Sequence, residues 1–216
     1  MSRSYVFLFP GDDKRSPEER LKTAAAAYLA DGEEPELLRA PSREAGEGWE
    51  VARGERGKPY FPQRPELGFS ISHTGPLWAC AFHRGPVGLD IQEHTRFRGE
   101  DWAAADERLG RLAVRFFHKK EAAYVGGSHE RFFQIWAAKE SYVKYTGRGI
   151  DEGFGEFSVL PSDLGERLPE SWEALGVRFH ETALSNGFTV CVCMERGAGC
   201  ALYTCTGPAF RRQSIF

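Results

Sequence analysis

The segment from Trp136 to Gly149 combines side chains that could do chemistry. It reads Trp-Ala-Ala-Lys-Glu-Ser-Tyr-Val-Lys-Tyr-Thr-Gly-Arg-Gly. Residues four apart share one face of a helix, so the Glu140 carboxylate and the Lys144 ammonium would lie together, with Lys139 beside them. A carboxylate that can bind a metal, next to a cation that can donate a proton, suits reactions on phosphate groups. Taken alone, the two residues are more simply interpreted as a surface ion pair.

A second carboxylate lies where apolar and polar residues alternate. Leu89 and Ile91 alternate with Asp90 and Gln92, so a strand would bury the first pair and present the second pair together. Carboxylate and amide oxygens select magnesium over zinc, and proteins hold magnesium through one or two carboxylates plus water and phosphates. Asp90 and Glu140 would form such a pair if the strand and the helix meet. Without a partner, Asp90 would be an ordinary edge or turn charge.

Two further segments carry groups that suit contacts with anions. Lys58 stands between Gly57 and Pro59, so a constrained turn would hold its ammonium. A phosphate contact and a solvated hairpin lysine both fit that local pattern. Ser72 and His73 end an alternating strand, where a hydroxyl and an imidazole can hold a phosphate. Neighbours on a strand point to opposite faces, which argues against a nucleophilic serine–histidine pair.

Hydrophobic periodicity and turn residues predict the elements that carry these groups. Helices are expected at residues 17–29, 101–117 and 129–145. Strands are expected at residues 5–9, 49–53, 68–72, 77–83, 87–92, 155–160, 176–180, 188–194 and 200–205. Residues 31–48, rich in glutamate, proline and glycine, predict an irregular connection. Each half of the chain therefore combines helix with several antiparallel strands, an α+β layout.

Composition and charge narrow the class of protein. The 216 residues are 41% hydrophobic and 27% charged, as in soluble globular proteins. A net charge of -3 argues against broad nucleic-acid binding. No apolar run approaches the roughly 20 residues that span a bilayer, and the apolar N-terminal segment is too short for a secretory signal. The sequence predicts a cytoplasmic protein without nucleic-acid or membrane partners.

The cysteines do not have the spacing of a zinc site. No pair is spaced Cys-x-x-Cys, and no histidine lies among the four in the last quarter of the chain. Small buried thiols in a reducing cytosol are the better interpretation. The cysteines are Cys80, Cys191, Cys193, Cys200 and Cys205.

Together with the segment Phe-His-Lys-Lys-Glu that ends at Glu121, these motifs resemble the 4'-phosphopantetheinyl transferases of the longer, monomeric Sfp type. Gly-x-Asp alone is a weak motif, whereas Trp-x-x-Lys-Glu-Ser-x-x-Lys is a strong one, and the motifs follow one another in the family's order. The resemblance covers roughly residues 57–160, while both ends match only in outline. The matching segments are residues 57–61, 69–75, 88–92, 116–121 and 136–149.

The resemblance implies a pseudo-twofold pair of similar α/β halves, each with a helix packed on a small antiparallel sheet, and coenzyme A bound between them. Residues 1–98 would form the N-terminal half, with the nucleotide contacts and the metal strand. Residues 99–216 would form the C-terminal half, with the metal and catalytic helix. A monomer is expected.

The resemblance also implies roles for the acidic residues and Lys144. Asp90 and Glu140 fall on the metal ligands. Gln92 falls where many members have glutamate, so both direct coordination and a weaker contact through water fit an amide there. Glu121 falls on a carboxylate with metal or base duty. Lys144 falls on the lysine near the bridging phosphate. Magnesium is the expected ion, with manganese as the alternative.

Coenzyme A contacts are implied on both halves. Ser72 and His73 fall on residues that hold the 3'-phosphate of the nucleotide, and Lys58 falls on a lysine near the adenine nucleotide. Arg20 is the candidate for an N-terminal arginine that contacts phosphate. Lys139 joins this group as a second cation beside Glu140.

The reaction implied is transfer of the phosphopantetheine arm from coenzyme A, the co-substrate, to a serine of an apo acyl or peptidyl carrier protein, releasing 3',5'-adenosine bisphosphate. Glu140 directly, or Glu121 through water, would take the serine proton. One alternative is a non-catalytic relative that binds coenzyme A or the carrier, against which the retained acidic residues and Lys144 argue. Another is a magnesium-dependent nucleotide phosphoesterase.

A stripe of basic residues follows one side of the helix expected at 101–117. It could dock an acidic carrier protein, but a solvated helix face explains it equally well. The stripe consists of Arg108, Arg111, Arg115 and Lys119.

Overall fold

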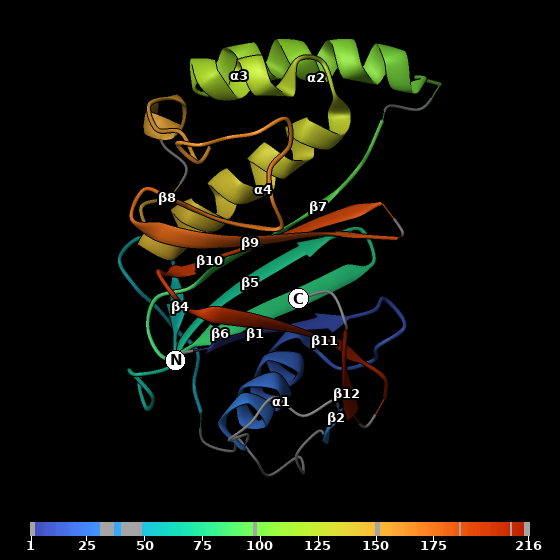
Figure 1. Ribbon diagram of the computed structural model, residues 1–216. Coiled ribbons are helices and arrows are strands. Elements are labelled where there is room, and N and C mark those ends of the chain that lie inside the picture. The colour runs from blue at the N-terminus through green and yellow to red at the C-terminus, as the bar shows by residue number, and fades with distance from the viewer. Residues whose placement is uncertain are drawn as a thin grey trace.

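The computed structural model describes residues 3–30, 37–39, 49–96, 99–149, 152–185, 187–207 and 209–213. Two stacked sheets form the centre, with one helix below them and three above (Figure 1). No helix in these ranges is long and apolar enough to cross a membrane. The helices are α1 (Pro17–Ala30), α2 (Trp102–Phe116), α3 (Lys119–Val125) and α4 (His129–Thr146), with a short 3-10 turn at Glu152–Gly155.

The lower sheet has six strands in the order β2-β12-β11-β1-β6-β5. Helix α1 covers its outer face with a run of buried alanines against an aromatic cluster that includes Phe7, Phe82 and Tyr203. The strands are β1 (Arg3–Phe9), β2 (Leu37–Arg39), β5 (Gly68–Thr74), β6 (Leu77–His83), β11 (Gly199–Cys205) and β12 (Ala209–Arg212).

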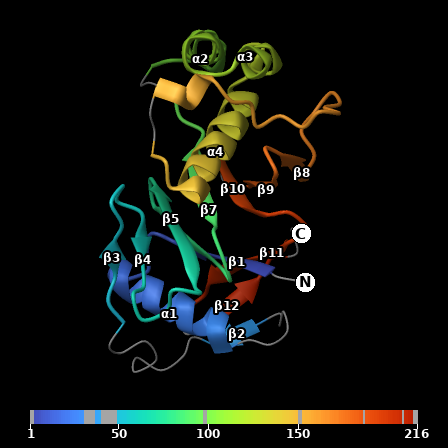
Figure 2. The same cartoon turned by 90° about the vertical axis from the view of Figure 1, so that its left-hand side faces the viewer.

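The upper sheet has four antiparallel strands in the order β7-β10-β9-β8. Helix α4 lies across its outer face, and α2 and α3 lie beyond α4 (Figure 2). The strands are β7 (Gly88–Glu93), β8 (Ser171–Ala174), β9 (Val177–Leu184) and β10 (Phe188–Glu195). A separate two-stranded hairpin, β3 (Ala52–Arg53) and β4 (Pro59–Tyr60), stands beside β5.

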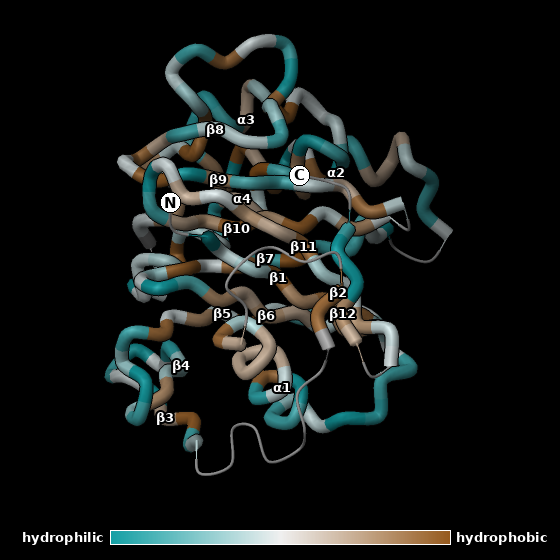
Figure 3. The backbone as a smooth tube through the Cα atoms, turned by 60° about the horizontal axis from the view of Figure 1, so that its bottom comes forward, coloured by the Kyte–Doolittle hydropathy of each residue, from teal (hydrophilic) through white to brown (hydrophobic). Residues whose placement is uncertain are grey.

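The inner faces of the two sheets share one apolar core. Val6 and Leu8 of β1 meet Leu89 of β7 and Val192 of β10 in this core. Alternation along each strand sends the neighbouring residues to the outer faces, where the helices cover them. In Figure 3 the hydrophobic colours accordingly follow the strands, and the hydrophilic colours lie mostly in the outer loops.

The strand pairing differs from two sequence-based expectations. Strands β1 and β11 pair in parallel, with Tyr5 opposite Ala201, so the lower sheet is mixed rather than wholly antiparallel. The sheets also do not divide at residue 98, because β7 pairs with β10 and β11 pairs with β1. Each sheet thus contains strands from both sides of the expected boundary. Periodicity alone cannot reveal such pairing between distant segments.

The expected strand at 155–160 is absent from the described residues there. A 3-10 turn occupies Glu152–Gly155, and the backbone that follows is bound by side chains. The N–H of Val159 donates to a Glu121 carboxylate oxygen at 2.8 Å, and Trp172 Nε1 donates to the Val159 carbonyl at 2.7 Å. These contacts replace a strand ladder. The five cysteines are free thiols and buried, as the sequence predicted.

Candidate active site

Gly88 allows helix α4 to lie directly on strand β7. A Cβ at this position would come 1.8 Å from the carbonyl oxygen of Ser141 and 2.5 Å from the amide nitrogen of Tyr145. Only glycine therefore fits beneath the helix without displacing its backbone. This close approach brings Asp90, two residues further along β7, beneath the face of α4 that carries Glu140 and Lys144. The strand and the helix meet as the sequence analysis required.

Asp90 is buried and accepts hydrogen bonds on both carboxylate oxygens. Its Oδ1 accepts from Lys144 Nζ at 2.6 Å and from Ser72 Oγ at 2.9 Å. Its Oδ2 accepts from Gln92 Nε2 at 2.5 Å. Lys144 Nζ also lies 3.2 Å from Ser72 Oγ. The acid thus sits in a network that fixes its orientation and holds a counter-charge beside it.

Glu140 contrasts with Asp90. Its side chain has no hydrogen bond or ion pair to any residue in the described part of the chain, although the residue is only 8% exposed. Burial and, next, the negative charge of Asp90 raise the pKa of Glu140 to about 7, against the opposing effect of Lys144. The two carboxylates are therefore close enough to repel each other, and only one of them has a cation.

The donor set at this point fits a magnesium ion. Asp90 and Glu140 supply carboxylates and Gln92 an amide oxygen, all of them hard ligands. The mutual repulsion that raises the pKa of Glu140 would be relieved by a bound cation. Across the described ranges, no group of three or more His, Cys, Asp or Glu side chains gathers into a metal cage. A pair of carboxylates that leaves room for water and phosphate is the arrangement typical of magnesium.

Two hollows meet at Glu140 and Lys144. The larger, of about 430 Å³, runs between β5, the β3–β4 hairpin and the C-terminal end of α4. The smaller, of about 370 Å³, contains Asp90, Gln92 and Trp136. Glu140, Lys144 and Ile71 line both hollows, so the hollows adjoin. A substrate lying in the larger hollow would reach Asp90 and Glu140, the acid pair, at this junction.

Lys58 lines the larger hollow but is held by the end of α4. Its ammonium donates to the Tyr145 carbonyl at 3.0 Å and lies 3.4 Å from the Val87 carbonyl. Burial lowers the pKa of Lys58. A cation is favoured at the C-terminal end of a helix, where unpaired carbonyls point outward. Gly147 ends α4 with a φ of 70°, as predicted.

Ser72 and His73 point to different faces of β5. Ser72 is buried in the Asp90 network and also accepts from the Ile91 N–H at 3.2 Å. His73 is exposed at the strand end and lines the smaller hollow. The two residues are therefore not a nucleophilic pair. Ser72 orients Asp90 rather than offering a free hydroxyl to a phosphate.

Comparison with known proteins shows which family this chain belongs to. The model of the 4'-phosphopantetheinyl transferase superfamily matches residues 86–193, half of the chain, including β7 and α4. The chain belongs to the 4'-phosphopantetheinyl transferase superfamily. The match contains both carboxylates of the acid pair and Lys144.

Curated relatives in this superfamily agree. The chain is 31% identical over 147 residues to 4'-phosphopantetheinyl transferase Sfp of Bacillus subtilis strain 168, covering 64% of this chain and 60% of that protein. It is 29% identical over 168 residues to psf-1 of Bacillus pumilus, covering 74% and 67%. It is 32% identical over 117 residues to AcpT of Salmonella typhi, covering 53% and 58%. The match thus spans about three fifths of the length of the Sfp relative.

Two residues expected at the transferase site lie elsewhere. Glu121 and Lys139 are fully buried and pair with each other at 2.9 Å, and neither lines the two hollows. Lys139 also donates to the Phe157 carbonyl at 2.7 Å, and Glu121 accepts from the His118 N–H at 3.0 Å. The expectations of a coenzyme A contact and of metal or base duty therefore do not fit this geometry.

The reason is helical rotation. Consecutive residues on a helix point about 100° apart, so Lys139 and Glu140 cannot both face the site. Glu140 faces Asp90, and Lys139 faces α3. The Glu121–Lys139 pair then joins α3, α4 and the segment after the 3-10 turn into one unit.

Arg20 also lies away from both hollows. Its guanidinium contacts Asp13, with Nε 3.3 Å from Oδ1 and Nη2 2.6 Å from the Asp13 carbonyl. It lies over the rings of Phe9 and Trp78 on the α1 side of the lower sheet. The structure thus does not bring Arg20 together with the acid pair.

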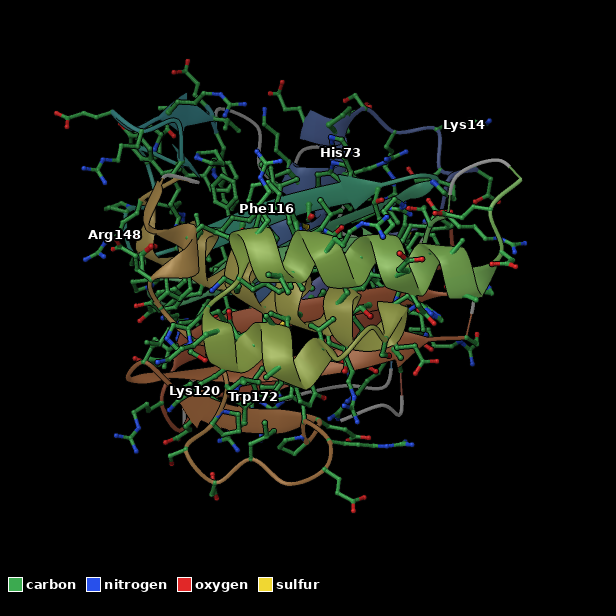
Figure 4. All side chains as sticks on the ribbon, turned by 90° about the horizontal axis from the view of Figure 1, so that it is seen from above. Lys14, His73, Phe116, Lys120, Arg148 and Trp172 are labelled. Atoms are coloured by element: carbon green, nitrogen blue, oxygen red, sulfur yellow. The ribbon has the colours of Figure 1, made fainter. Side chains whose placement is uncertain are left out.

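Sequence reasoning missed two guanidinium groups. Arg53 and Arg56 line the larger hollow beside Lys58, and Trp136 lines the smaller one. The sequence contains the signal, because both arginines lie just before the Gly57-Lys58 turn. Arg148, whose glycine neighbours line the larger hollow, points to the outer edge of the molecule (Figure 4).

The arginines of the basic stripe lie on α2 and largely contact other residues of the chain, whereas Lys119 begins α3. Arg108 pairs with Glu100 at 3.0 Å, and Arg111 pairs with Glu107 at 2.5 Å. Arg115 lies over the ring of Phe116, which marks the end of α2 in Figure 4. The stripe is therefore less positive than its arginines suggest.

Proposed function

We propose that this protein transfers the 4'-phosphopantetheine arm of coenzyme A to a serine of an apo acyl or peptidyl carrier protein. The observation that carries the proposal is the junction of the two hollows, where Asp90, Glu140 and Lys144 meet. Acids and a cation at the end of a basic hollow suit a reaction at the pyrophosphate of a nucleotide. Membership of the transferase superfamily supports the same reaction.

The chemistry makes one bond and breaks one. The serine oxygen of the carrier attacks the phosphorus that bears the pantetheine arm and forms a new phosphate ester bond. The bond from that phosphorus to the bridging oxygen breaks, and its electron pair leaves with 3',5'-adenosine bisphosphate. The serine proton must be taken up, and negative charge develops on the leaving phosphate.

Glu140 is our choice for the base. Of the two carboxylates that the sequence offered, Glu140 lines both hollows and has no partner among the described residues, whereas Glu121 is buried in contact with Lys139. A base must reach the proton it accepts, either directly or through one water. Access therefore favours Glu140.

We assign Lys144 as the cation that stabilises the negative charge on the leaving phosphate. It reaches into the junction from α4, one turn beyond Glu140, and its ammonium lies 2.6 Å from Asp90 Oδ1. A fixed positive charge stabilises charge that develops in the transition state. Asp90 and Ser72 hold this ammonium in place before substrate arrives.

Asp90 and Glu140, with Gln92 as the third donor, would hold the magnesium or manganese ion that this reaction needs. The bound ion would neutralise phosphate charge and polarise the phosphoryl group. Gln92 now donates its amide to Asp90, so it can orient that ligand whether or not its own oxygen coordinates.

The test is to incubate the protein with magnesium, coenzyme A and an apo carrier, and to weigh the carrier by mass spectrometry. A gain of one phosphopantetheine group is expected with the wild type and with Glu130→Gln, a control at an exposed site on the same helix. Glu140→Gln should leave the carrier unmodified while the protein stays folded. Transfer at the wild-type rate by Glu140→Gln would refute the assignment.

The same assay separates the alternatives. Hydrolysed coenzyme A with an unmodified carrier would favour a phosphoesterase. Binding of coenzyme A without any reaction across a panel of acyl and peptidyl carriers would favour a non-catalytic relative. The pseudo-twofold relation of the halves, the monomeric state and the cytoplasmic location stay predictions of the sequence.

A further inference from the structure

Three polar side chains form one row across the upper sheet, beneath α4 (Figure 1). The strand register places Cys191 of β10 between Asp90 of β7 and Glu181 of β9, and all three residues are buried. Burial raises the pKa of the Cys191 thiol, and the negative charges of Glu181 and Asp90 add to this rise. The row therefore leads from the acid pair, through a neutral thiol, to a carboxyl group that the proposed chemistry does not use.

Helix α4 contacts this row at three points, one on each strand. The contacts join Lys144 to Asp90 at 2.6 Å, Ser141 to Cys191 at 3.6 Å and Gln134 to Glu181 at 3.1 Å. The contact to Asp90 lies at the active site, where Gly88 also holds α4 against β7. The contact to Glu181 lies nearer the N-terminal end of α4. It is thus the polar contact that fixes the other end of the helix above the sheet.

Gln134 is held from a second side by α3. Its Oε1 accepts from the Tyr124 hydroxyl at 3.4 Å, and that hydroxyl accepts from the Leu168 N–H at 3.1 Å. Its Nε2 donates to Glu181 Oε1. The amide oxygen of Gln134 therefore faces α3 and its NH2 group faces β9, so Gln134 can only donate to the carboxyl group.

The other oxygen of Glu181 has no such donor. Glu181 is 6% exposed, and its Oε2 has no hydrogen-bond partner among the described residues. The groups around it are the Gln134 amide from α4, the Cys191 thiol from β10 and, before β8, the Glu170 carbonyl that accepts the Glu181 N–H at 2.8 Å. None of these groups is a cation. An ionised carboxylate here would need water at Oε2, and that water would have to enter between β9 and α4.

We propose that Gln134 and Glu181 are positioning residues for the transfer, and that Glu181 holds α4 in place only while its carboxyl group is protonated. Ionisation would draw water under the N-terminal half of α4 and tilt the helix about its contact with Gly88. Glu140, on the same helix, would then move relative to Asp90. This inference rests on the proposed function, because it concerns the rate of that transfer. Neither positioning residue lines the two hollows.

The pH dependence of transfer tests the proposal. Burial raises the pKa of Glu181 to about 7, against the opposing effect of the Gln134 hydrogen bond. In the wild type, kcat/KM for the carrier should therefore fall roughly tenfold between pH 7 and pH 8.5. Glu181→Gln keeps a neutral group of the same shape and should lose this fall. Glu130→Gln, at an exposed site on α4, should keep it. An equal fall in Glu181→Gln and the wild type would overturn the proposal.

Gln134→Leu provides a test with a defined direction. The hydrogen bond from Gln134 favours the ionised carboxylate, so its loss should raise the pKa of Glu181 further. The fall in kcat/KM should then move to higher pH, in addition to a lower rate at every pH. A merely structural role for Gln134 would lower the rate without moving the profile, and that result would contradict the proposal.

Amide hydrogen exchange separates this inference from the transferase function. After correction for the intrinsic exchange rate, the α4 amides of the wild type should lose protection between pH 6.5 and pH 8.5, and those of Glu181→Gln should not. If this difference appears but no carrier is modified, the dependence of α4 on Glu181 stands and the proposed reaction falls. If carriers are modified but the two proteins show equal protection at both pH values, the positioning proposal falls alone.

Discussion

Gly88 of β7 lies so close to Ser141 of α4 that a Cβ on the glycine would come 1.8 Å from the serine carbonyl oxygen. This contact sets the distance and rotation of α4 above the strand. It places Glu140 beside Asp90 and brings Lys144 to 2.6 Å from the Asp90 carboxylate. The glycine of the Gly-x-Asp motif is thus required by packing, and the aspartate by chemistry.

Replacing Gly88 by alanine should damage both stability and site geometry. The added methyl group meets helix backbone, which cannot move aside without shifting α4. Overpacking of this kind costs roughly 1–3 kcal/mol in the free energy of unfolding, measured by chemical denaturation. Gly165→Ala is the matched control, because a Cβ there meets nothing within 4 Å. Equal stability of the two variants would contradict the role given to Gly88.

Replacing Gln92 by glutamate should strengthen metal binding. The change adds a third carboxylate next to Asp90 and Glu140, where the amide of Gln92 now donates to Asp90 at 2.5 Å. Without metal, the extra charge should lower the free energy of unfolding through repulsion. With manganese, calorimetry should give a lower Kd than for the wild type. A weaker or unchanged affinity would show that residue 92 lies outside the coordination sphere.

Replacing Glu121 by glutamine should lower the free energy of unfolding, because the Glu121–Lys139 pair joins α3 and α4. It should not act by removing a base. Lys139 would keep a buried charge without its partner, at a cost of about 3–5 kcal/mol. Replacing both residues by uncharged ones, in the double variant Glu121→Gln/Lys139→Met, removes the unpaired charge. It should recover part of the stability and of the transfer rate. If the double variant is as stable as the wild type but inactive, Glu121 acts in catalysis after all.

Because of the buried Glu181 carboxyl group, we expect the free energy of unfolding to fall as the pH rises. It lies under α4, where Oε1 accepts from Gln134 Nε2 at 3.1 Å and Oε2 is buried without a partner among the described residues. Burial raises the pKa of Glu181 from its ordinary value of 4.5 to about 7. The folded protein therefore holds this proton more tightly than the unfolded chain. The contribution of the Glu181 proton to the free energy of unfolding is therefore fully present below pH 4.5 and is lost as the pH rises through 7.

The expected loss for Glu181 is about 3 kcal/mol at most, from 1.36 kcal/mol for each pKa unit. Denaturation of the wild type and of Glu181→Gln at pH 5 and pH 8 measures it. The variant, which stays neutral, should gain stability relative to the wild type at pH 8 and not at pH 5. Parallel curves for the two proteins at both pH values would show that Glu181 does not titrate in this range.

The acid pair could be predicted from the sequence because its two halves are local patterns. The alternation around Asp90 places its carboxylate on one face of a strand, and the spacing of four places Glu140 and Lys144 on one face of a helix. The order of the motifs then implied that this strand and this helix meet. The rotation that separates Lys139 from Glu140 is different, because it depends on where α4 rests on Gly88. Strand periodicity likewise gave β1 and β11 but not their parallel pairing, which joins the two ends of the chain.

The central claim is that the junction of Asp90, Glu140 and Lys144 transfers phosphopantetheine to a carrier. The most direct measurement follows both products in one sample with magnesium, coenzyme A and apo carrier, by carrier mass and by chromatography of the nucleotide. Equal amounts of holo carrier and 3',5'-adenosine bisphosphate are expected with the wild type, and neither product is expected with Glu140→Gln. Nucleotide product without holo carrier, or equal product from the variant, would contradict the central claim.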